Sequence, residues 1–360
     1  MSTLTDYIKW RGDLSFHQDK CNDFDNLVFS AIAYVDLNDI LSDHEKGLVS
    51  LCDVSNQYFE KSGNKVLHVD NPVLREAPGI LRQAAMTKRY GQVYIRNYTS
   101  ETKDEENLQF AAMEFVMTDG NSYIAFRGTD DTIVGWKEDF LLAATEVESE
   151  KKAVDYVYSI MKGNNNCFHI GGHSKGGHLA VYAAVRCPAD IQDRILNVYT
   201  NDGPGFSKGF AEEARKSPIL DRIVRIIPEY SVVGMLLESI GKTTIVKSTN
   251  KLILQHDLMT WELDGPEFVT VREVSKTSKK LQKSITTWLD QFEIEERDQF
   301  IDEIFAVLES SGKETFTEVI DGGLKSFQNM TKHLYGLSEN TRDQIGNILK
   351  IFLTEMVWSE

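Results

Sequence analysis

The residues best suited to chemistry lie in one short stretch, where Gly172, Ser174 and Gly176 form a G-x-S-x-G pattern. An apolar segment, CFHIGG, leads into this pattern, and a segment with helical periodicity, GGHLAVYAAVR, continues from it. A serine at the apex of a strand-turn-helix exposes its hydroxyl, and small neighbours let the sharp turn close. The helix N-terminus would also stabilise an oxyanion. The pattern predicts Ser174 as a nucleophile, against the alternative of a glycine-rich turn with a capping serine.

A serine nucleophile needs a base, and in the fold that this elbow indicates, the acid and then the histidine follow the serine along the chain. His178, His256 and His333 satisfy this order. His178 lies one helical turn beyond the serine, and His333 lies in a helical tail, so neither is placed to reach the hydroxyl. His256 ends the apolar run KLILQH, as expected for a loop that leaves a strand. We therefore predict His256 as the general base.

The elements around these residues predict an α/β-hydrolase fold with a mostly parallel central sheet flanked by helices. The segments QVYIRNY, LQFAAMEFVM and SYIAFRG are β-rich, and the residues at 118–121 mark a hairpin between the last two. From about 148 onward helix and strand alternate, which indicates parallel strands joined by crossover helices. Polar stretches at 99–107 and 272–280 are expected to be a hairpin tip and a connector.

Helical patterns stand at both ends of this sheet-forming region. FDNLVFSAIAYVDL follows an Asn22/Asp23 start signal and predicts a helical N-terminal leader packed on the main domain. After Val274 the chain has helical patterns throughout. We therefore expect an α/β-hydrolase domain over 1–274, which includes the leader, and a helical C-terminal region over 275–360 packed on it.

Two motifs resemble class 3 lipases. YIAFRGT at 123–129, followed by Trp136 and Asp139, resembles the strand and oxyanion loop of that family, and GHSKGG at 172–177 resembles its elbow. The resemblance covers residues 92–261. A closer similarity, which extends into the helical ends, is to a group of uncharacterised bacterial lipase-like proteins.

The resemblance implies roles for the residues around the serine. The backbone N–H groups of Thr129 and Lys175 would form the oxyanion hole. No S-x-x-K spacing links Lys175 to the serine, so its side chain is expected in solvent. His173 is expected to be structural, because enzymes of the family often carry that residue without using it.

The acid of the triad is harder to assign. Class 3 lipases carry an aspartate after the strand that here reads RIVRII, but this chain continues PEYSVVG without one. One strand earlier, Asp202 stands at a strand end before a turn, a position that resembles the acid site of pancreatic-type lipases. We predict Asp202 as the acid that orients His256, with an Asp-Gly-Pro turn as the structural alternative. Glu229 is the second choice, and Asp257 is disfavoured because consecutive side chains on an extended segment point to opposite sides.

The segment at 230–241 lies between the acid and base regions, and its apolar residues recur with helical spacing between two glycines. It is predicted to be a short mobile cover in which Met235 and Leu236 contact substrate. An ordinary crossover helix in the core is the alternative on periodicity alone.

Composition restricts the function further. The chain has 360 residues and a formal net charge of −16, which disfavours binding to nucleic acid and to anionic surfaces. No signal peptide or membrane-spanning segment is evident, and four scattered cysteines suit a reducing compartment, so a cytoplasmic location is expected. No metal-binding pattern, phosphate loop or dinucleotide fingerprint occurs, so no cofactor is expected.

Together these observations predict a serine hydrolase that cleaves a carboxylic ester, with a lipid or lysolipid among the candidate substrates, through an acyl-serine intermediate. An acyltransferase or a thioesterase with the same triad is one alternative. A non-catalytic binding protein of the same fold is another, because a fold does not establish an activity.

Overall fold

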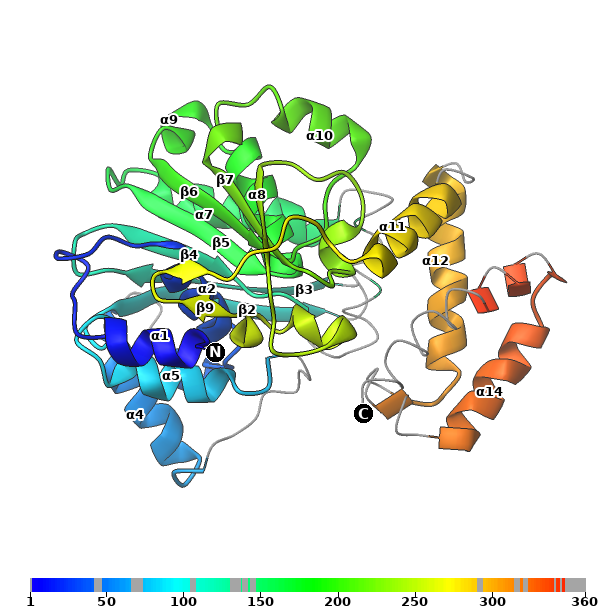
Figure 1. The fold of residues 1–360 in the computed structure, drawn as a ribbon, viewed down its shortest axis with the longest axis horizontal. Helices are drawn as coiled ribbons and strands as arrows, with labels where there is room; N and C mark the ends of the chain where they lie inside the picture. The colour runs from blue at the N-terminus through cyan, green and yellow to red at the C-terminus, as the bar shows by residue number, and fades with distance from the viewer. Residues whose placement is uncertain are drawn as a thin grey trace.

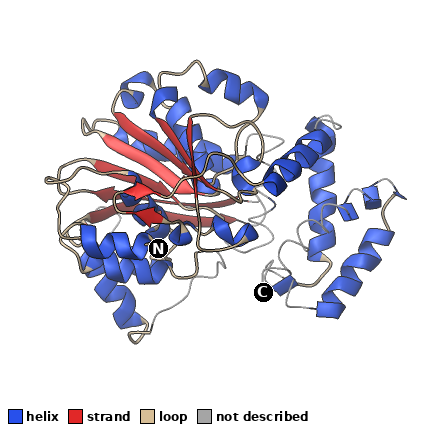
Figure 2. Ribbon diagram, viewed as in Figure 1, coloured by secondary structure: helices blue, strands red, loops and turns tan. Residues whose placement is uncertain are grey.

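Eight strands form one central sheet in the computed structural model of the chain (Figure 2). The structure describes residues 2–41, 47–65, 74–103, 108–129, 137, 142, 147–289, 294–313, 318–319, 323–339, 341–343 and 345–346. In spatial order, which is also sequence order, the strands are β1 (Val49–Ser50), β2 (Tyr94–Lys103), β3 (Leu108–Val116), β4 (Ser122–Phe126), β5 (Phe168–His173), β6 (Ile195–Asn201), β7 (Ile223–Pro228) and β8 (Lys242–Val246).

The sheet changes direction at β4. Strands β1 to β4 pair antiparallel, whereas β4 to β8 pair parallel. The predicted hairpin between β3 and β4 is present, since the backbone N–H of Met117 donates to Asn121 and Gly120 has a φ of 87°. The predicted tip at 99–107 was too long, because residues 99–103 belong to β2; residues 104–107 lie outside the described residues.

Helices precede, connect and follow the strands. Those before β2 are α1 (Leu4–Arg11), α2 (Asp23–Ile32), α3 (Asn38–Leu41), α4 (Leu51–Lys61) and α5 (Ala77–Ala85), and those within the parallel part are α7 (Glu148–Met161), α8 (Lys175–Arg186), α9 (Ala189–Gln192) and α10 (Lys208–Ala214). After the sheet, the helices with bounds within the described residues are α11 (Lys276–Leu289), α12 (Ile294–Glu309) and α14 (Gly323–Tyr335). Short 3-10 turns are η2 (Leu220–Arg222), η3 (Val233–Met235), η4 (Leu252–His256) and η5 (Leu258–Thr260), and β9 (Leu263–Asp264) pairs with β10 (Glu267–Phe268).

The strand order places the connecting helices on one face. Because β4 to β8 are neighbours in sequence and in space, right-handed crossovers carry their helices to the same side of the sheet. Helices α7, α8 and α10 bury that face together with strand residues such as Ile124 and Ile170. This is the mostly parallel, helix-flanked sheet of an α/β-hydrolase fold, as the sequence predicted.

The opposite face is covered by the N-terminal leader. Phe29 of α2 stacks on Phe115 and lies against Tyr123, and both partners belong to strands. Figure 1 shows α1, α4 and α5 on the side of the sheet away from α9 and α10. Asn22 caps α2 by accepting from the N–H groups of Phe24 and Asp25, which confirms the predicted start. The helix ends at Ile32, earlier than its sequence pattern suggested.

The chain after residue 274 is helical where it is described, and α11, α12 and α14 lie beside the sheet (Figure 1). Helix α11 begins at Lys276, inside the stretch predicted as a connector, so the connector is shorter than expected. Helix α11 packs against η3, and α12 packs against α14. Residues 347–360, which hold most of the last predicted helix, lie outside the described residues. In the described part of the chain, no helix is long and apolar enough to cross a membrane.

Candidate functional site

Ser174 lies at the apex of a tight turn between β5 and α8. Its φ of 55° and ψ of −131° fall outside the regions that non-glycine residues ordinarily adopt. The glycines on either side have no room for a side chain: a Cβ on Gly176 would lie 2.2 Å from the carbonyl oxygen of Phe126, and one on Gly172 would lie 2.4 Å from the backbone of Gly176. Close packing of strand against helix therefore requires both glycines and holds Ser174 at the start of α8.

Asp202 and His256 meet beside this turn. Asp202, the residue after β6, places Oδ2 2.6 Å from Nδ1 of His256, and the Asp202 side chain is fully buried. Since an ionised carboxylate only accepts hydrogen bonds, Nδ1 carries the proton and Nε2 is left as the basic nitrogen. In the described part of the chain the Ser174 hydroxyl makes no hydrogen bond to His256; such contacts often tighten only when substrate binds.

The other two acid candidates do not take this place. Asp257 accepts the N–H of Met259 at 2.9 Å and caps η5. The backbone N–H of Glu229 pairs with Val246 of β8. The run that ends at His256 forms the 3-10 turn η4, so the prediction of a strand at this position was wrong. The histidine is presented by a turn that follows β8.

His173 contacts both the backbone and the ring of His256. Its Nε2 lies 2.7 Å from the carbonyl oxygen of His256, which only accepts, so this nitrogen donates. Burial lowers the pKa of His173 well below its usual range, and His256 lowers it further, so the ring is neutral. Its Nδ1 is then an acceptor for the Tyr34 hydroxyl, 3.0 Å away. The two imidazole rings also pack with centroids 4.3 Å apart, and the structural role expected for His173 follows from these contacts.

The remaining histidines have other neighbours. His178 is buried in α8, where Nε2 lies 2.8 Å from Glu150 Oε1 and Nδ1 lies 3.0 Å from the carbonyl oxygen of Gly205. His333 is exposed on α14. Neither is paired with Asp202.

The two residues predicted to form the oxyanion hole flank the elbow. Thr129 is buried and follows Gly128, where a Cβ would lie 2.6 Å from the carbonyl oxygen of His173. Lys175 begins α8, but its side chain was wrongly expected in solvent: it is fully buried and Nζ donates to the carbonyl oxygen of Gln109 at 2.8 Å. Trp136 and Asp139 lie outside the described residues.

The segment at 230–241 differs from its prediction. It contains one short turn, η3, instead of a helix, because Leu236 and Glu238 pair with the backbone of Gly205 and Phe206. Gly234 is buried, and its N–H donates to Oδ1 of Asp202 at 3.2 Å; a mobile cover stays a prediction. Met235 and Leu236 are half-buried at the edge of the loop at 202–206 that follows β6, which we call the acid loop.

Two residues that the sequence analysis did not single out contact a triad candidate or the neighbouring His173. Tyr34 comes from the leader, 139 residues before its partner His173, and no local pattern marks it. Ser231 donates to Oδ1 of Asp202 at 2.5 Å. The signal for Ser231 was its place in the loop after β7, where class 3 lipases carry an aspartate and this chain has none.

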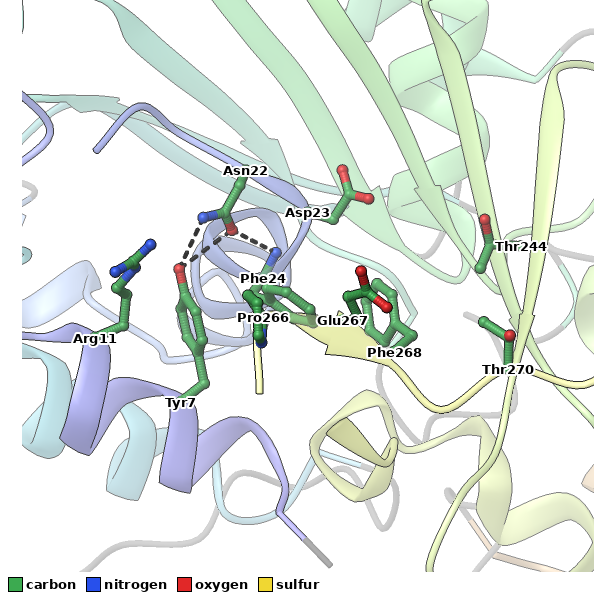
Figure 3. A pocket seen from close by; sticks show the side chains of 10 residues that line it. All are labelled: Tyr7, Arg11, Asn22, Asp23, Phe24, Thr244, Pro266, Glu267, Phe268 and Thr270. Atoms are coloured by element: carbon green, nitrogen blue, oxygen red, sulfur yellow. Dashed lines mark hydrogen bonds between the residues drawn. The ribbon is translucent and has the colours of Figure 1, made fainter. Parts of the chain in front are cut away.

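A separate hollow of about 430 Å³ lies between the leader and the β9–β10 hairpin, as Figure 3 shows. It is lined by Tyr7, Arg11, Asn22, Asp23, Phe24, Thr244, Pro266, Glu267, Phe268 and Thr270. None of these belongs to the triad candidates, and Asn22 already caps α2 there. The candidate site is therefore identified by its chemistry, not by this hollow. No group of three metal-ligating side chains occurs within the described ranges.

The chain is similar, at low sequence identity, to several solved lipase structures. A Rhizomucor miehei lipase–propeptide complex matches with 15% identity over 64% of this chain and 70% of that chain, at a TM-score of 0.37. A triacylglycerol lipase from Penicillium expansum matches with 11% identity over 51% of this chain and 82% of that chain, at a TM-score of 0.33. An extracellular lipase from Serratia marcescens matches with 16% identity over 59% of this chain and 40% of that chain, at a TM-score of 0.30. No curated protein matches. The family described as Mbeg1-like matches residues 84–306, which is more than half of the sequence, and the chain is therefore a member of the Mbeg1-like family.

Proposed function

We propose that the chain is a serine hydrolase that cleaves a carboxylic ester. The observation that carries the proposal is the 2.6 Å contact between Asp202 and His256 beside Ser174, whose backbone has a positive φ of 55° at the turn between β5 and α8. A strained backbone at a serine, next to a buried acid–imidazole pair, is typical of a nucleophile and its base.

In the proposed mechanism the Ser174 hydroxyl attacks the ester carbonyl and passes its proton to Nε2 of His256. Asp202 stabilises the imidazolium through Nδ1–H. The N–H groups of Thr129 and Lys175 and the N-terminus of α8 hold the oxyanion. The imidazolium then protonates the leaving alkoxide, and an acyl-serine remains. Water, deprotonated by His256, attacks the acyl-serine and releases the acid, and the proton returns to Ser174.

The substrate class is part of the same proposal. The resemblance to class 3 lipases favours a lipid or lysolipid ester, and the half-buried apolar side chains of Met235 and Leu236 beside the acid loop suit an acyl chain. The likeness to bacterial lipase-like proteins stays a prediction. A thioesterase or acyltransferase would use the same residues with a different leaving group or acceptor.

We also propose the two-part organisation expected from the sequence, with a hydrolase domain over 1–274 and a helical region over 275–360. An ion pair of 2.8 Å joins Lys137, in the segment that follows Thr129, to Asp302 of α12, and supports a place for this region near the site. A cytoplasmic location is proposed because all four cysteines are free.

The test is covalent labelling with a fluorophosphonate probe, together with turnover of p-nitrophenyl esters. The wild type should label and turn over, and both signals should disappear in Ser174→Ala while the fold is retained. The mechanism would be excluded if mass spectrometry located the label on any other residue, or if turnover in Ser174→Ala were undiminished. A folded wild type that neither labels nor turns over any ester would favour a non-catalytic binding protein.

A further inference from the structure

Ser231 lies in the loop where the resembled family carries its acid. Class 3 lipases have an aspartate after the strand that is β7 here, and Ser231 is the third residue beyond that strand. Its side chain is fully buried, and Oγ donates to Oδ1 of Asp202 at 2.5 Å. The serine therefore faces the carboxylate that has taken the acid's place from the neighbouring strand.

The rest of the loop holds the same oxygen. The N–H of Gly234 donates to Oδ1 of Asp202 at 3.2 Å, and a Cβ on Gly234 would lie only 2.3 Å from that atom. The buried Arg225 guanidinium donates to the Gly234 carbonyl oxygen. Burial lowers the pKa of Arg225 to about 10, and the charge of Asp202 opposes this change. Oδ1 is thus held by the β7 loop, which leaves Oδ2 for His256.

The loops that carry Asp202 and Ser231 follow two neighbouring parallel strands, β6 and β7, at the same edge of the sheet. Strands β6 and β7 are parallel neighbours, and the Asp202 N–H pairs with Ile226 of β7. Asp202 has a φ of 49°, which Asp and Asn tolerate better than most residues. Because the Ser231 oxygen already touches the carboxylate, an aspartate at 231 would extend into the space that a shorter side chain at 202 would vacate.

We propose that Ser231 is a positioning residue of the triad, which orients the Asp202 carboxylate toward His256, and that residues 202 and 231 can exchange the acid between them. This inference rests on the proposed function. Without the Ser231 hydroxyl, the carboxylate loses its closest donor and turns more freely about its last torsion. The imidazole then loses its fixed tautomer and orientation in the transition state, while substrate binding is unaffected.

The first test is Ser231→Ala, with kcat and KM measured on a p-nitrophenyl ester. Loss of one hydrogen bond to a charged group predicts a decrease in kcat of about 10- to 100-fold, with KM unchanged. Ser122→Ala is the matched control, because Ser122 is also fully buried and donates to a buried carboxylate, Glu114, at 2.6 Å. It lies at the far end of β4 from the elbow, so its loss should lower stability and leave kcat unchanged.

The second test exchanges the residues. Asp202→Ser should lower kcat by about 10⁴-fold, and the double variant Asp202→Ser, Ser231→Asp should recover at least about 100-fold of this loss. The exchange keeps the same atoms in the site, so core volume is conserved. Asp202→Gly with Ser231→Asp is made in parallel, because glycine tolerates the positive φ at 202 and vacates the same space. Circular dichroism and thermal unfolding confirm that each variant is folded.

The outcomes separate the two proposals. If the wild-type protein shows no ester turnover that is lost in Ser174→Ala, both the proposed function and this inference are overturned. Wild-type turnover that is unchanged in Ser231→Ala, or lowered to the same extent in Ser122→Ala, would overturn the positioning role alone. Two folded exchange variants that are no more active than Asp202→Ser would overturn the exchange of the acid.

Discussion

Replacing Asp25 with asparagine should destabilise the fold by about 3–5 kcal/mol, because it removes the nearer counter-charge of the buried Arg89 guanidinium and leaves only Asp19, whose Oδ2 lies 3.9 Å from Nη1. Both side chains have no exposed surface, and Arg89 reaches the two carboxylate oxygens at 2.7 and 2.5 Å. The Tyr90 hydroxyl also donates to Asp25 at 2.6 Å. The remaining N–H groups of Arg89 bind backbone carbonyl oxygens of the leader, at Leu14, Asp19 and Lys20.

An exposed pair of similar length provides the comparison. Arg186 and Glu213 lie 2.7 Å apart, but their side chains are 41% and 47% exposed. Since solvent screens such a pair, Glu213→Gln should cost less than about 1 kcal/mol. The two substitutions each convert one carboxylate into an amide, so the difference between them isolates the effect of burial.

The free energy of unfolding is measured by urea unfolding, followed by fluorescence and by circular dichroism. Each variant is compared with the wild type under the condition that the dependence of the free energy on urea concentration (the m-value) is unchanged. Added salt should narrow the small effect of Glu213→Gln and leave the effect of Asp25→Asn almost unchanged. A cost below about 1 kcal/mol for Asp25→Asn, or equal costs for the two variants, would refute the reasoning from burial.

Four further changes test other parts of the molecule. Asp202→Asn should lower kcat by about 10⁴-fold with little change in KM, measured by steady-state kinetics. Met235→Glu should weaken hydrolysis of a long-chain ester far more than that of an acetate ester; equal losses would place Met235 outside the substrate site. Burial raises the pKa of Asp257 to about 7, above about 4 in the unfolded chain, so the contribution of Asp257 to stability should fall as the pH rises between those values, and Asp257→Asn should remove this contribution from the slope measured by pH-dependent urea unfolding. The exposed Cys52 should react with maleimide in the native protein, whereas Cys187, buried and with its pKa raised to about 12, should react only after unfolding, as read by peptide mass.

The sequence predicted those features that local patterns determine. The elbow at Ser174 was evident because its glycines are required by contacts within a few residues of the turn and by one neighbouring strand. The start of α2 was evident because the Asn22 cap acts within three residues. The alternation of strands and helices predicted the parallel part of the sheet for the same reason.

Features that depend on distant contacts were not predicted. The burial of Lys175 depends on a carbonyl oxygen 66 residues away, and no neighbour in sequence indicates it. The apolar spacing at 230–241 suggested a helix, but pairing with the acid loop imposes an extended course after η3. Ser231 acquires its contact only when two strand ends meet. In each case tertiary pairing overrides local periodicity.

The leader is synthesised before the sheet that it covers, and some of its partners come much later. Asn26 of α2 exchanges hydrogen bonds with Asn201, which lies 175 residues further along the chain, and Tyr34 waits 139 residues for His173. At about 5–20 residues per second, translation of the longer interval takes about 10 to 35 s. Helix α2 meets its first strands earlier, because Phe29 packs on Phe115 of β3 and Tyr123 of β4, whereas Asn26 lacks Asn201 for the whole interval. Nascent chains stalled before β3 should therefore bind chaperones through residues 23–35, and release should begin when β3 and β4 emerge from the ribosome.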